Sequence, residues 1–175
     1  MPNKSKNGLP SIVFTGLCLI AYGCGTSQPS PSPVGTPAIP NLRQFAPGEY
    51  RGGQPLTKAD FVWLQSVGVS NVIKLNTPTE GTDSVPPGMT VYQFPIDTMQ
   101  QLVSGPDPVE MQMAVSLITP GTFVHCSHGQ DRTGLLVGLY RLKQGWAKTN
   151  AYTEMLTNGF HPALHGLHEF WENAK

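Results

Sequence analysis

The stretch "VHCSHGQDRTG" at residues 124–134 constrains this chain more than any other, because a cysteine, two histidines and an Asp-Arg pair share eleven positions. The preceding residues 121–124 favour a strand, whereas Leu135 to Leu142 repeat apolar side chains at helical spacing. The stretch is therefore predicted to be a loop that joins a buried strand to the N-terminus of a helix.

Strand-like and helix-like patterns alternate along the last three quarters of the chain. Strands are expected at 49–55, 71–76, 89–97 and 121–126, and helices at 57–69, 107–119, 133–144, 147–158 and 162–173. Thr57 and Asp107 are the predicted N-caps of the first two helices. This alternation predicts an α/β fold with a central, mostly parallel sheet flanked by helices. The loop would lie between the last core strand and a helix.

The first 40 residues differ in composition from the rest. Residues 1–24 have a short positive start and an apolar run, and are predicted to be a signal peptide. The segment "LIAYGCG" at residues 19–25 resembles a bacterial lipobox with two atypical residues, so Cys24 is the predicted lipidation site. Simple secretion and an uncleaved apolar anchor are the alternatives. Residues 25–40 are rich in Pro and Ser and are predicted to be a solvated linker. The domain would then span 41–175, in an exported bacterial protein.

Charge and cysteine content narrow the function classes. The formal net charge is zero, so no basic surface for nucleic acid is expected. Of the three cysteines, Cys126 alone lies in the predicted domain, where it has no disulfide partner and belongs to no zinc-binding pair. An unpaired cysteine of this kind is either an inert buried residue or a nucleophile. A third interpretation, a redox sensor, lacks a resolving cysteine.

The composition of the loop fits phosphate binding. Backbone amides at a helix N-terminus can cradle a phosphate dianion, and Gly129 permits a positive φ in mid-loop. Gly134 would let the first helical turn approach closely. The planar guanidinium of Arg132 can grip two phosphate oxygens. The predicted phosphate-binding residues are Ser127, His128, Gly129, Gln130, Asp131 and Arg132.

The same positive potential acts on the thiol in the loop. Helix N-termini and nearby cations favour the thiolate form of a cysteine, which is the nucleophilic form. Cys126 is therefore the predicted nucleophile. The hydroxyl of Thr133 can donate a hydrogen bond to its sulfur, which would make it a better leaving group.

These residues carry a family resemblance. "HCSHGQDRTG" resembles the signature H-C-x-x-G-x-x-R-[ST]-G of the protein tyrosine phosphatase superfamily, and every fixed position matches: His125, Cys126, Gly129, Arg132, Thr133 and Gly134. Residues 41–175 are similar to the compact dual-specificity branch. The resemblance implies a cysteine-dependent phosphatase that needs no metal or other cofactor. It implies a structural role for His125, with direct proton transfer as the alternative.

The resemblance also implies an acid on a loop before the cysteine. "FPIDT" places Asp97 twenty-nine positions before Cys126, at the end of a predicted strand. We predict that Asp97 protonates the leaving group and later deprotonates the hydrolytic water. A cap on the following turn is the alternative role for Asp97, and Asp83 is the competing acid.

The substrate class is less constrained. A loop that ends in "DRT" is similar to those of myotubularin and Sac-type inositide phosphatases, so inositol (poly)phosphate is the leading expectation. Phosphotyrosine or other phosphoproteins are the alternative, and a non-catalytic phosphate-binding lipoprotein is an alternative of another class. Asp131 either bears on the substrate or complements the dipole of its helix. A monomer that contacts the membrane only through a lipid anchor is expected.

Further side chains are assigned by pattern. Three histidines at helical spacing are predicted to form a polar face over the mouth of the site, with a surface stripe or a metal site as alternatives: His161, His165 and His168. Candidates for contacts at the rim are Arg51, Lys74 and Lys143. The predicted core aromatics are Trp63, Trp146, Phe160 and Trp171.

Overall fold

The structure, a computed structural model, describes residues 35–81 and 85–175. The predicted signal peptide with Cys24, most of the predicted linker, and Asp83 lie outside these residues. Within the described ranges, no helix combines the length and the apolar character needed to cross a membrane.

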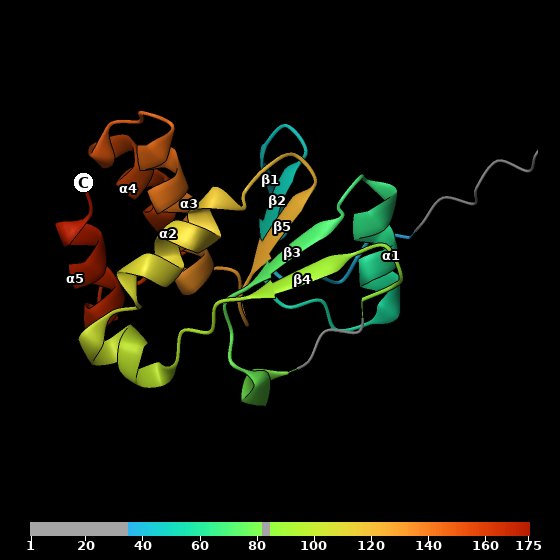
Figure 1. The fold of residues 1–175 in the computed structure, drawn as a ribbon, viewed down its shortest axis with the longest axis horizontal. Helices are drawn as coiled ribbons and strands as arrows, with labels where there is room; N and C mark the ends of the chain where they lie inside the picture. The colour runs from blue at the N-terminus through green and yellow to red at the C-terminus, as the bar shows by residue number, and fades with distance from the viewer. Residues whose placement is uncertain (1–34, 82–84) are drawn as a thin grey trace, which may run out of the picture. The chain divides into compact units, whose positions relative to one another are not determined.

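Five strands form one sheet in the order β1 (Arg43–Ala46), β2 (Glu49–Gly52), β5 (Thr122–His125), β3 (Asn71–Lys74), β4 (Thr90–Gln93). β1 runs antiparallel to β2, and the other neighbours are parallel (Figure 1). The predicted α/β fold with a mostly parallel sheet is confirmed. The sequence did not predict β1, because this edge strand is largely exposed and lacks an alternating apolar pattern.

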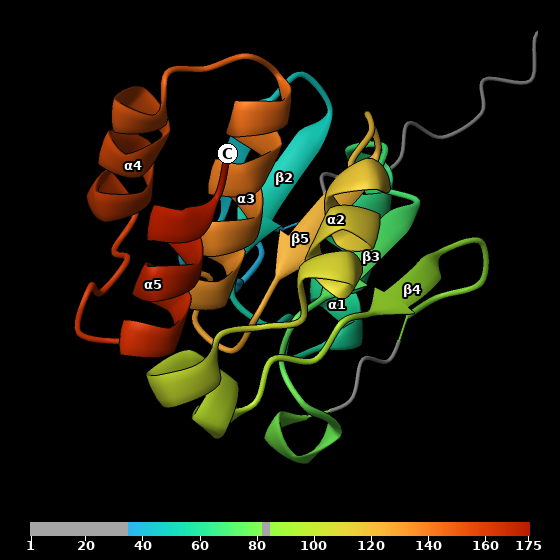
Figure 2. The same cartoon turned by 60° about the vertical axis from the view of Figure 1, so that its left-hand side comes forward.

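Helices cover both faces of the sheet. α1 (Lys58–Ser66) lies on one face, and α2 (Pro108–Ser116), α3 (Asp131–Lys143), α4 (Lys148–Thr157) and α5 (His165–Asn173) lie on the other (Figure 2). Side chains of successive strand residues point to opposite faces. Val72 and Phe123 accordingly belong to the core beneath α1, whereas Ile73 and Val124 belong to the core beneath the larger helical layer. The two central strands, β3 and β5, are thus buried on both faces.

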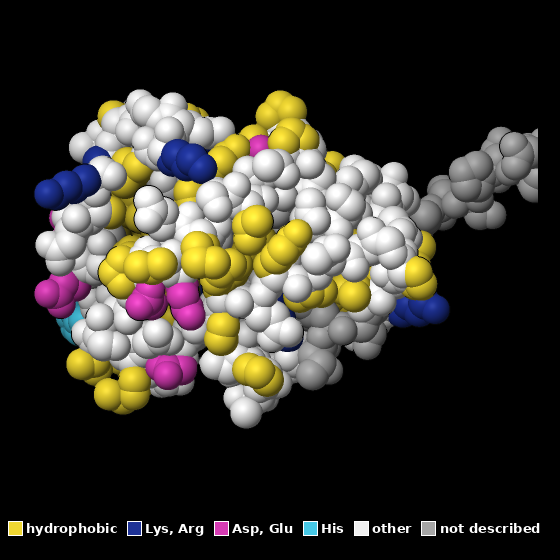
Figure 3. Space-filling view, in the orientation of Figure 1, with side chains coloured by type: hydrophobic (Ala, Val, Ile, Leu, Met, Phe, Trp, Pro, Cys, Tyr) yellow, Lys and Arg dark blue, Asp and Glu magenta, His cyan; other side chains and the backbone are white. Residues whose placement is uncertain are grey.

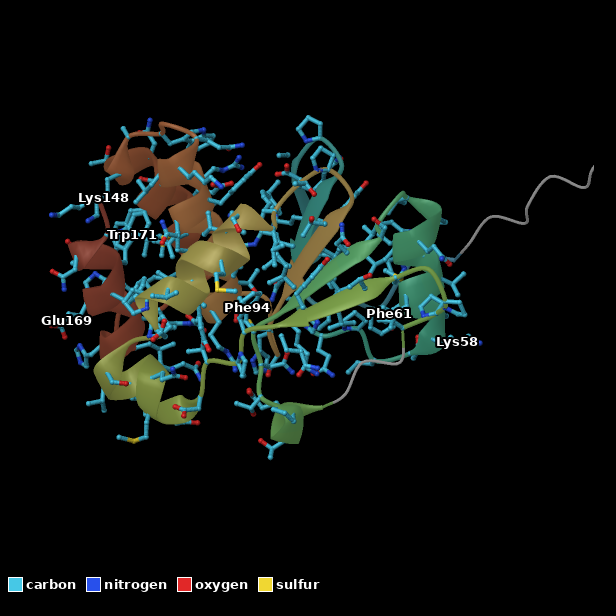
Figure 4. All side chains as sticks on the ribbon, in the orientation of Figure 1. Lys58, Phe61, Phe94, Lys148, Glu169 and Trp171 are labelled. Carbon is cyan, nitrogen blue, oxygen red and sulfur yellow. The ribbon has the colours of Figure 1, made fainter. Side chains whose placement is uncertain are left out.

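α1 shows how the sequence determines one helix. Thr57 is its N-cap, as predicted: the Thr57 hydroxyl accepts from the Asp60 amide, and the Asp60 carboxylate accepts from the Thr57 amide. Phe61 and Leu64 are buried, and Lys58 at the first turn is exposed. Figure 4 shows Phe61 directed from α1 towards the sheet and Lys58 directed away from it.

Residues 38 and 39, just before the sheet begins, pack on the face of the domain that α1 covers. The amide of Ala38 donates to Asp60 at 2.8 Å, and Ile39 is buried in the core beneath α1. The last residues of the predicted linker therefore pack onto the domain. The second predicted cap is also confirmed, because Asp107 accepts hydrogen bonds from two amides in the first turn of α2.

The core aromatics are only partly as predicted. Phe160 and Trp171 are buried, and the ring of Trp171 lies 5.6 Å from Nζ of Lys148 (Figure 4). Trp63 is half-buried, and the prediction for Trp146 is wrong, because 42% of it is exposed. The ring of Trp146 instead covers the guanidinium of Arg141, with 4.3 Å between Cζ of Arg141 and the ring centroid.

Candidate active site

The signature loop follows the central strand β5 and ends where α3 begins. Cys126 is 3% exposed, and its Sγ accepts a hydrogen bond from the Gly129 amide at 3.3 Å. Gly129 has the predicted positive φ, 77°. A Cβ on Gly129 would overlap the backbone of Gly52 and Gly53 at the end of β2. Only glycine therefore permits both this turn and this close approach.

Arg132 is buried beside the thiol and held on several sides. Its Nη1 and Nη2 donate to the carboxylate of Glu80 at 2.7 and 2.6 Å, Nη1 also donates to the Ile96 carbonyl at 3.1 Å, and Nη2 donates to Ser127 Oγ at 3.1 Å. Burial opposes the charge on Arg132, but the hydrogen bond to Glu80 raises the pKa of Arg132 above its usual value. The guanidinium is thus fixed and fully charged.

Glu80 is the site residue that sequence reasoning missed. It ends the short helix η1 (Pro78–Glu80), in a segment that the sequence assigned to a loop. The hydrogen bond from Arg132 lowers the pKa of Glu80 to about 2. Its Oε2 also accepts from the Thr77 amide at 2.7 Å. The T-x-x-E pattern in "TPTE" was a local signal for this capping arrangement, but no local pattern connects it to Arg132.

Asp97 lies just beyond β4, near Arg132. Its Oδ1 accepts from the Gln100 amide at 2.8 Å, and its amide donates to Gln100 Oε1 at 2.8 Å. Asp97 therefore does cap the helical turn at residues 98–99 that leads into the π-helix η2 (Gln100–Ser104). The carbonyl of the preceding residue, Ile96, binds Arg132, so this loop adjoins the signature loop. The catalytic role of Asp97 stays a prediction.

Three fixed signature residues have different surroundings. His125 is fully buried and stacks on Phe123 at 5.5 Å between ring centroids, which fits a structural role. Thr133 is buried, and its Oγ1 makes no hydrogen bond to the residues that the structure describes, so the predicted donation to the sulfur of Cys126 is not observed. A Cβ on Gly134 would meet its nearest atoms at 3.7 Å, so the predicted close approach does not require glycine there.

The variable signature residues are placed as follows. Ser127 Oγ donates to Glu80 at 2.7 Å, and His128 is exposed. Asp131 Oδ1 lies 2.8 Å from the His161 amide and 2.9 Å from His161 Nδ1. Asp131 thus begins α3 and binds the α4–α5 connection, which favours the structural interpretation of this residue.

The three histidines at helical spacing, His161, His165 and His168, do not share one partner. His161 reaches the signature loop, whereas His168 Nε2 lies 3.0 Å from the hydroxyl of Tyr152, and His165 is exposed at the start of α5. The three histidines thus have different surroundings, and only His161 is seen to contact the signature loop; a shared polar face over the site stays a prediction. No group of three His, Cys, Asp or Glu side chains within 35–81 and 85–175 could hold a metal ion. Gln130 packs against Gly159 of the same connection.

The predicted rim cations are not at the rim. Arg51 and Lys74 are 1% and 3% exposed. Arg51 lies behind the signature loop, because β2 is the neighbour of β5, and Lys74 donates to the Gly81 carbonyl. Lys143 lies at the end of α3, where it lines a different cavity.

That cavity is a groove of about 930 Å³ between α2, α3 and α5, lined by residues that include Met111, Leu139 and Phe170. Hydrophobic side chains are exposed on this side of the molecule over α2 and η2 (Figure 3). The lining comes from the helices and the chain end, and not from the signature loop. The groove is therefore separate from the candidate active site.

Residues 50–154 match the family model described as the tyrosine phosphatase family. This chain therefore belongs to the tyrosine phosphatase family. The matched range contains the signature loop, Glu80 and Asp97.

Two curated relatives illustrate its place in the family. The chain is 27% identical over 122 residues to inositol diphosphatase DSP2 of Oryza sativa subsp. japonica, across 65% of this chain and 59% of that protein. It is 50% identical over 38 residues to the dual specificity protein phosphatase TpbA of Pseudomonas aeruginosa, across 21% of this chain and 17% of TpbA. The chain thus spans less than two thirds of the length of either relative.

Solved structures agree on the fold. The crystal structure of P. aeruginosa TpbA superposes with a TM-score of 0.63 at 23% identity, across 83% of this chain and 94% of the crystallised TpbA chain. The core catalytic domain of the PP-IP phosphatase SIW14 from S. cerevisiae superposes with a TM-score of 0.62 at 19% identity, across 80% of this chain and 89% of that crystallised domain.

Proposed function

We propose that this chain is an exported phosphatase that hydrolyses phosphate monoesters through a cysteinyl-phosphate intermediate. The observation that carries the proposal is the sulfur of Cys126, which is bound by the Gly129 amide in the same loop as the buried, charged Arg132. A non-catalytic phosphate receptor would need the amides and the guanidinium, but it would need neither a thiol nor a nearby acid.

In the first step the substrate phosphate binds the loop amides and Arg132. The thiolate of Cys126 attacks phosphorus, so that an S–P bond forms while the bond from phosphorus to the leaving oxygen breaks. Asp97 in its acid form donates its proton to that oxygen. Glu80 holds the guanidinium at two nitrogens, which fixes its orientation before the substrate arrives. Glu80, Ile96 and Ser127 together accept from all four Nη–H groups, so the Nε–H of Arg132 is its donor left for the phosphate, beside the loop amides.

In the second step the phosphoryl group passes to water. The carboxylate of Asp97 takes a proton from the water as its oxygen attacks phosphorus, and the S–P bond breaks. Inorganic phosphate leaves, and the thiolate of Cys126 and the acid form of Asp97 are restored. The loop amides and Arg132 stabilise the charge on the phosphoryl oxygens in both steps.

The leading substrate in this proposal is an inositol (poly)phosphate. Its support is the "DRT" end of the signature loop, the name inositol diphosphatase carried by the rice relative, and the fold shared with the PP-IP phosphatase SIW14. The alternative is a phosphotyrosine or other phosphoprotein. It is supported by the 50% identity to TpbA over 38 residues and by a TpbA variant solved in complex with pTyr, which superposes with a TM-score of 0.64.

A turnover panel tests the proposal. The full chain and Cys126→Ser are assayed on inositol hexakisphosphate, phosphoinositides, phosphotyrosine peptides and an aryl phosphate. We expect phosphate release by the wild type, fastest on an inositol phosphate, and none by the serine variant. Native turnover by Cys126→Ser would reject the mechanism. Activity on aryl phosphate and phosphopeptides alone would replace the leading substrate by the alternative.

Export and lipidation form a separate part of the proposal. Their support is the apolar run within 1–24 and the lipobox-like end at Cys24. Expression in a bacterium followed by membrane fractionation tests them, with Cys18→Ala as the matched control in the same segment. We expect the wild type and the control in the membrane fraction, and Cys24→Ala outside it or as an uncleaved precursor. Identical fractionation together with an identical molecular mass of all three, apart from the substitution itself, would reject lipidation.

A further inference from the structure

The guanidinium of Arg51 binds the signature loop from behind. Its Nη2 donates to the Gly129 carbonyl at 3.0 Å and to the Gln130 carbonyl at 3.4 Å. Arg51 reaches them because β2 pairs in parallel with β5, where Arg51 lies opposite Val124. Both carbonyls belong to the signature loop, whose backbone amides would face a bound phosphate.

The two preceding carbonyls of the loop are held in the same way. The amide of Gln54 donates to the Ser127 carbonyl at 3.2 Å, and Nδ2 of Asn41 donates to the His128 carbonyl at 2.9 Å. All four carbonyls from residue 127 to residue 130 therefore have a hydrogen-bond donor from segment 41–54. We call Asn41, Arg51 and Gln54 the outer brace.

The outer brace determines the direction of the loop amides. In a trans peptide the C=O and the following N–H point in opposite directions from one rigid plane. Within the described residues every peptide bond is trans. Carbonyls held outward at 127–130 thus turn the amides of 128–131 inward, and the Gly129 amide does reach Sγ of Cys126.

Arg51 also places a buried positive charge behind the thiol. It is 1% exposed, and its Nη1 is buried without a hydrogen-bond partner among the residues that the structure describes. Burial lowers the pKa of Arg51 to about 10, against the attraction of Glu154 and of the Cys126 thiolate, so Arg51 remains charged at neutral pH. The charge on Nη1 is therefore not neutralised by a hydrogen-bond partner and can interact with an anion in the loop.

We propose that Arg51 is a positioning residue for phosphoryl transfer, which aims the loop amides through the Gly129 and Gln130 carbonyls and stabilises the anionic loop by its charge. This inference rests on the proposed role of Cys126 as nucleophile. It differs from the role of Arg132, because Arg51 acts through the loop backbone and does not contact the phosphate.

The test uses the full chain with Arg51→Met and Arg51→Lys. Two quantities are measured: the rate of Cys126 alkylation by iodoacetamide at pH 6, followed by mass spectrometry of the peptide that carries Cys126, and the inhibition constant of inorganic phosphate against aryl phosphate turnover. For Arg51→Met we expect alkylation to slow about tenfold and phosphate to bind about tenfold more weakly, the size typical of a lost hydrogen bond to a charged donor. Arg51→Lys keeps the charge and should recover part of both losses.

Arg141→Met is the matched control. Its guanidinium is also buried, at 6% exposure, but it binds Glu154 and the Phe45 carbonyl and makes none of the loop contacts. We expect this variant to lose stability while alkylation at pH 6 and phosphate inhibition remain at wild-type values. A merely structural role of Arg51 would make the two methionine variants alike in all measurements.

Asn41→Gly keeps the inference testable if Arg51→Met does not fold. Asn41 is exposed and has φ 51°, which glycine adopts readily, so the substitution removes only the donor to the His128 carbonyl. We expect about threefold weaker phosphate inhibition with cooperative unfolding retained. Wild-type alkylation and phosphate inhibition in Arg51→Lys and Asn41→Gly would overturn the inference. Native turnover by Cys126→Ser would overturn the proposed function instead.

Discussion

Replacing Glu80 by glutamine removes one charge from the pair that Glu80 forms with Arg132. The pair is bidentate, with N–O distances of 2.6 and 2.7 Å, and Arg132 is 6% exposed at its side chain while Glu80 is 32% exposed. The amide of Glu80→Gln has almost the same shape, but it keeps only one acceptor oxygen and has an NH2 donor in place of the other. The change therefore removes the carboxylate charge together with one of the two hydrogen bonds from Arg132.

The magnitude follows from the pKa of Glu80. The hydrogen bond from Arg132 lowers that pKa from 4.5 to about 2. Each pKa unit is equivalent to about 1.36 kcal/mol, which sets an upper limit of about 3.4 kcal/mol for the free energy of unfolding. Because about a third of the side chain is exposed and water screens the pair, we expect a loss of about 1–2 kcal/mol at pH 7.

The sign of the pH dependence is also determined. A carboxylate whose pKa is lower in the folded state stabilises the protein above the pKa of the unfolded state, 4.5. This stability is lost as the pH falls through the folded value of about 2. The difference in unfolding free energy between wild type and Glu80→Gln should therefore be largest above pH 5.5. At pH 3 it should fall to about 40% of that value.

Urea unfolding at pH 7 and at pH 3 measures these differences, and phosphate inhibition at pH 7 measures the effect on Arg132. Glu154→Gln is the control, because Glu154 also binds an arginine at two nitrogens but makes no hydrogen bond to Arg132. We expect both variants to lose stability at pH 7, and only Glu80→Gln to bind phosphate more weakly. An equal loss of stability at both pH values for Glu80→Gln would refute the reasoning.

Three further substitutions have defined outcomes. Asp97→Asn should lower kcat on an inositol or alkyl phosphate about 100-fold or more while KM changes little, because these leaving oxygens need a proton; steady-state kinetics with unchanged kcat would remove Asp97 from the mechanism. Gly129→Ala should cost at least about 2 kcal/mol in urea unfolding, because its Cβ overlaps β2 at a positive φ. Gly134→Ala, with 3.7 Å to the nearest atoms, should cost nothing, and equal losses in the two alanine variants would contradict the geometry. Asp131→Asn should change the unfolding free energy by less than about 1 kcal/mol and leave KM unchanged, since the carboxylate binds the exposed His161; a raised KM in steady-state assays would instead place Asp131 at the substrate.

Several features of the fold could be predicted because they depend on residues close together in the chain. The caps at Thr57 and Asp107 need only a side chain and amides two or three positions away. The positive φ of Gly129 belongs to the turn between β5 and α3. Apolar runs of the correct length indicated the central strands and the helices that cover them. For the same reason, the nucleophile and the phosphate-binding arginine could be assigned from one short loop.

The partners of those residues could not be found in this way. Glu80 lies 52 positions before Arg132, and Arg51 lies 78 positions before Gly129. The sequence makes Arg51 only a candidate for the rim, but the strand order places β2 beside β5, which buries its side chain behind the loop. Trp146 was assigned to the core, yet it covers a guanidinium at the surface, where an aromatic ring gains a cation contact.

The amino-acid sequence by itself determined the chemistry of this protein: a thiol, a guanidinium and a glycine-containing turn within eleven residues, at a strand-to-helix junction. Only the tertiary structure decided what surrounds that loop, with the carboxylate of Glu80 on one side and the guanidinium of Arg51 behind it. The physical reason is that hydrogen bonds within one turn depend on neighbouring residues. Contacts between segments fifty or more positions apart depend on which strands pair and on which face each side chain is buried.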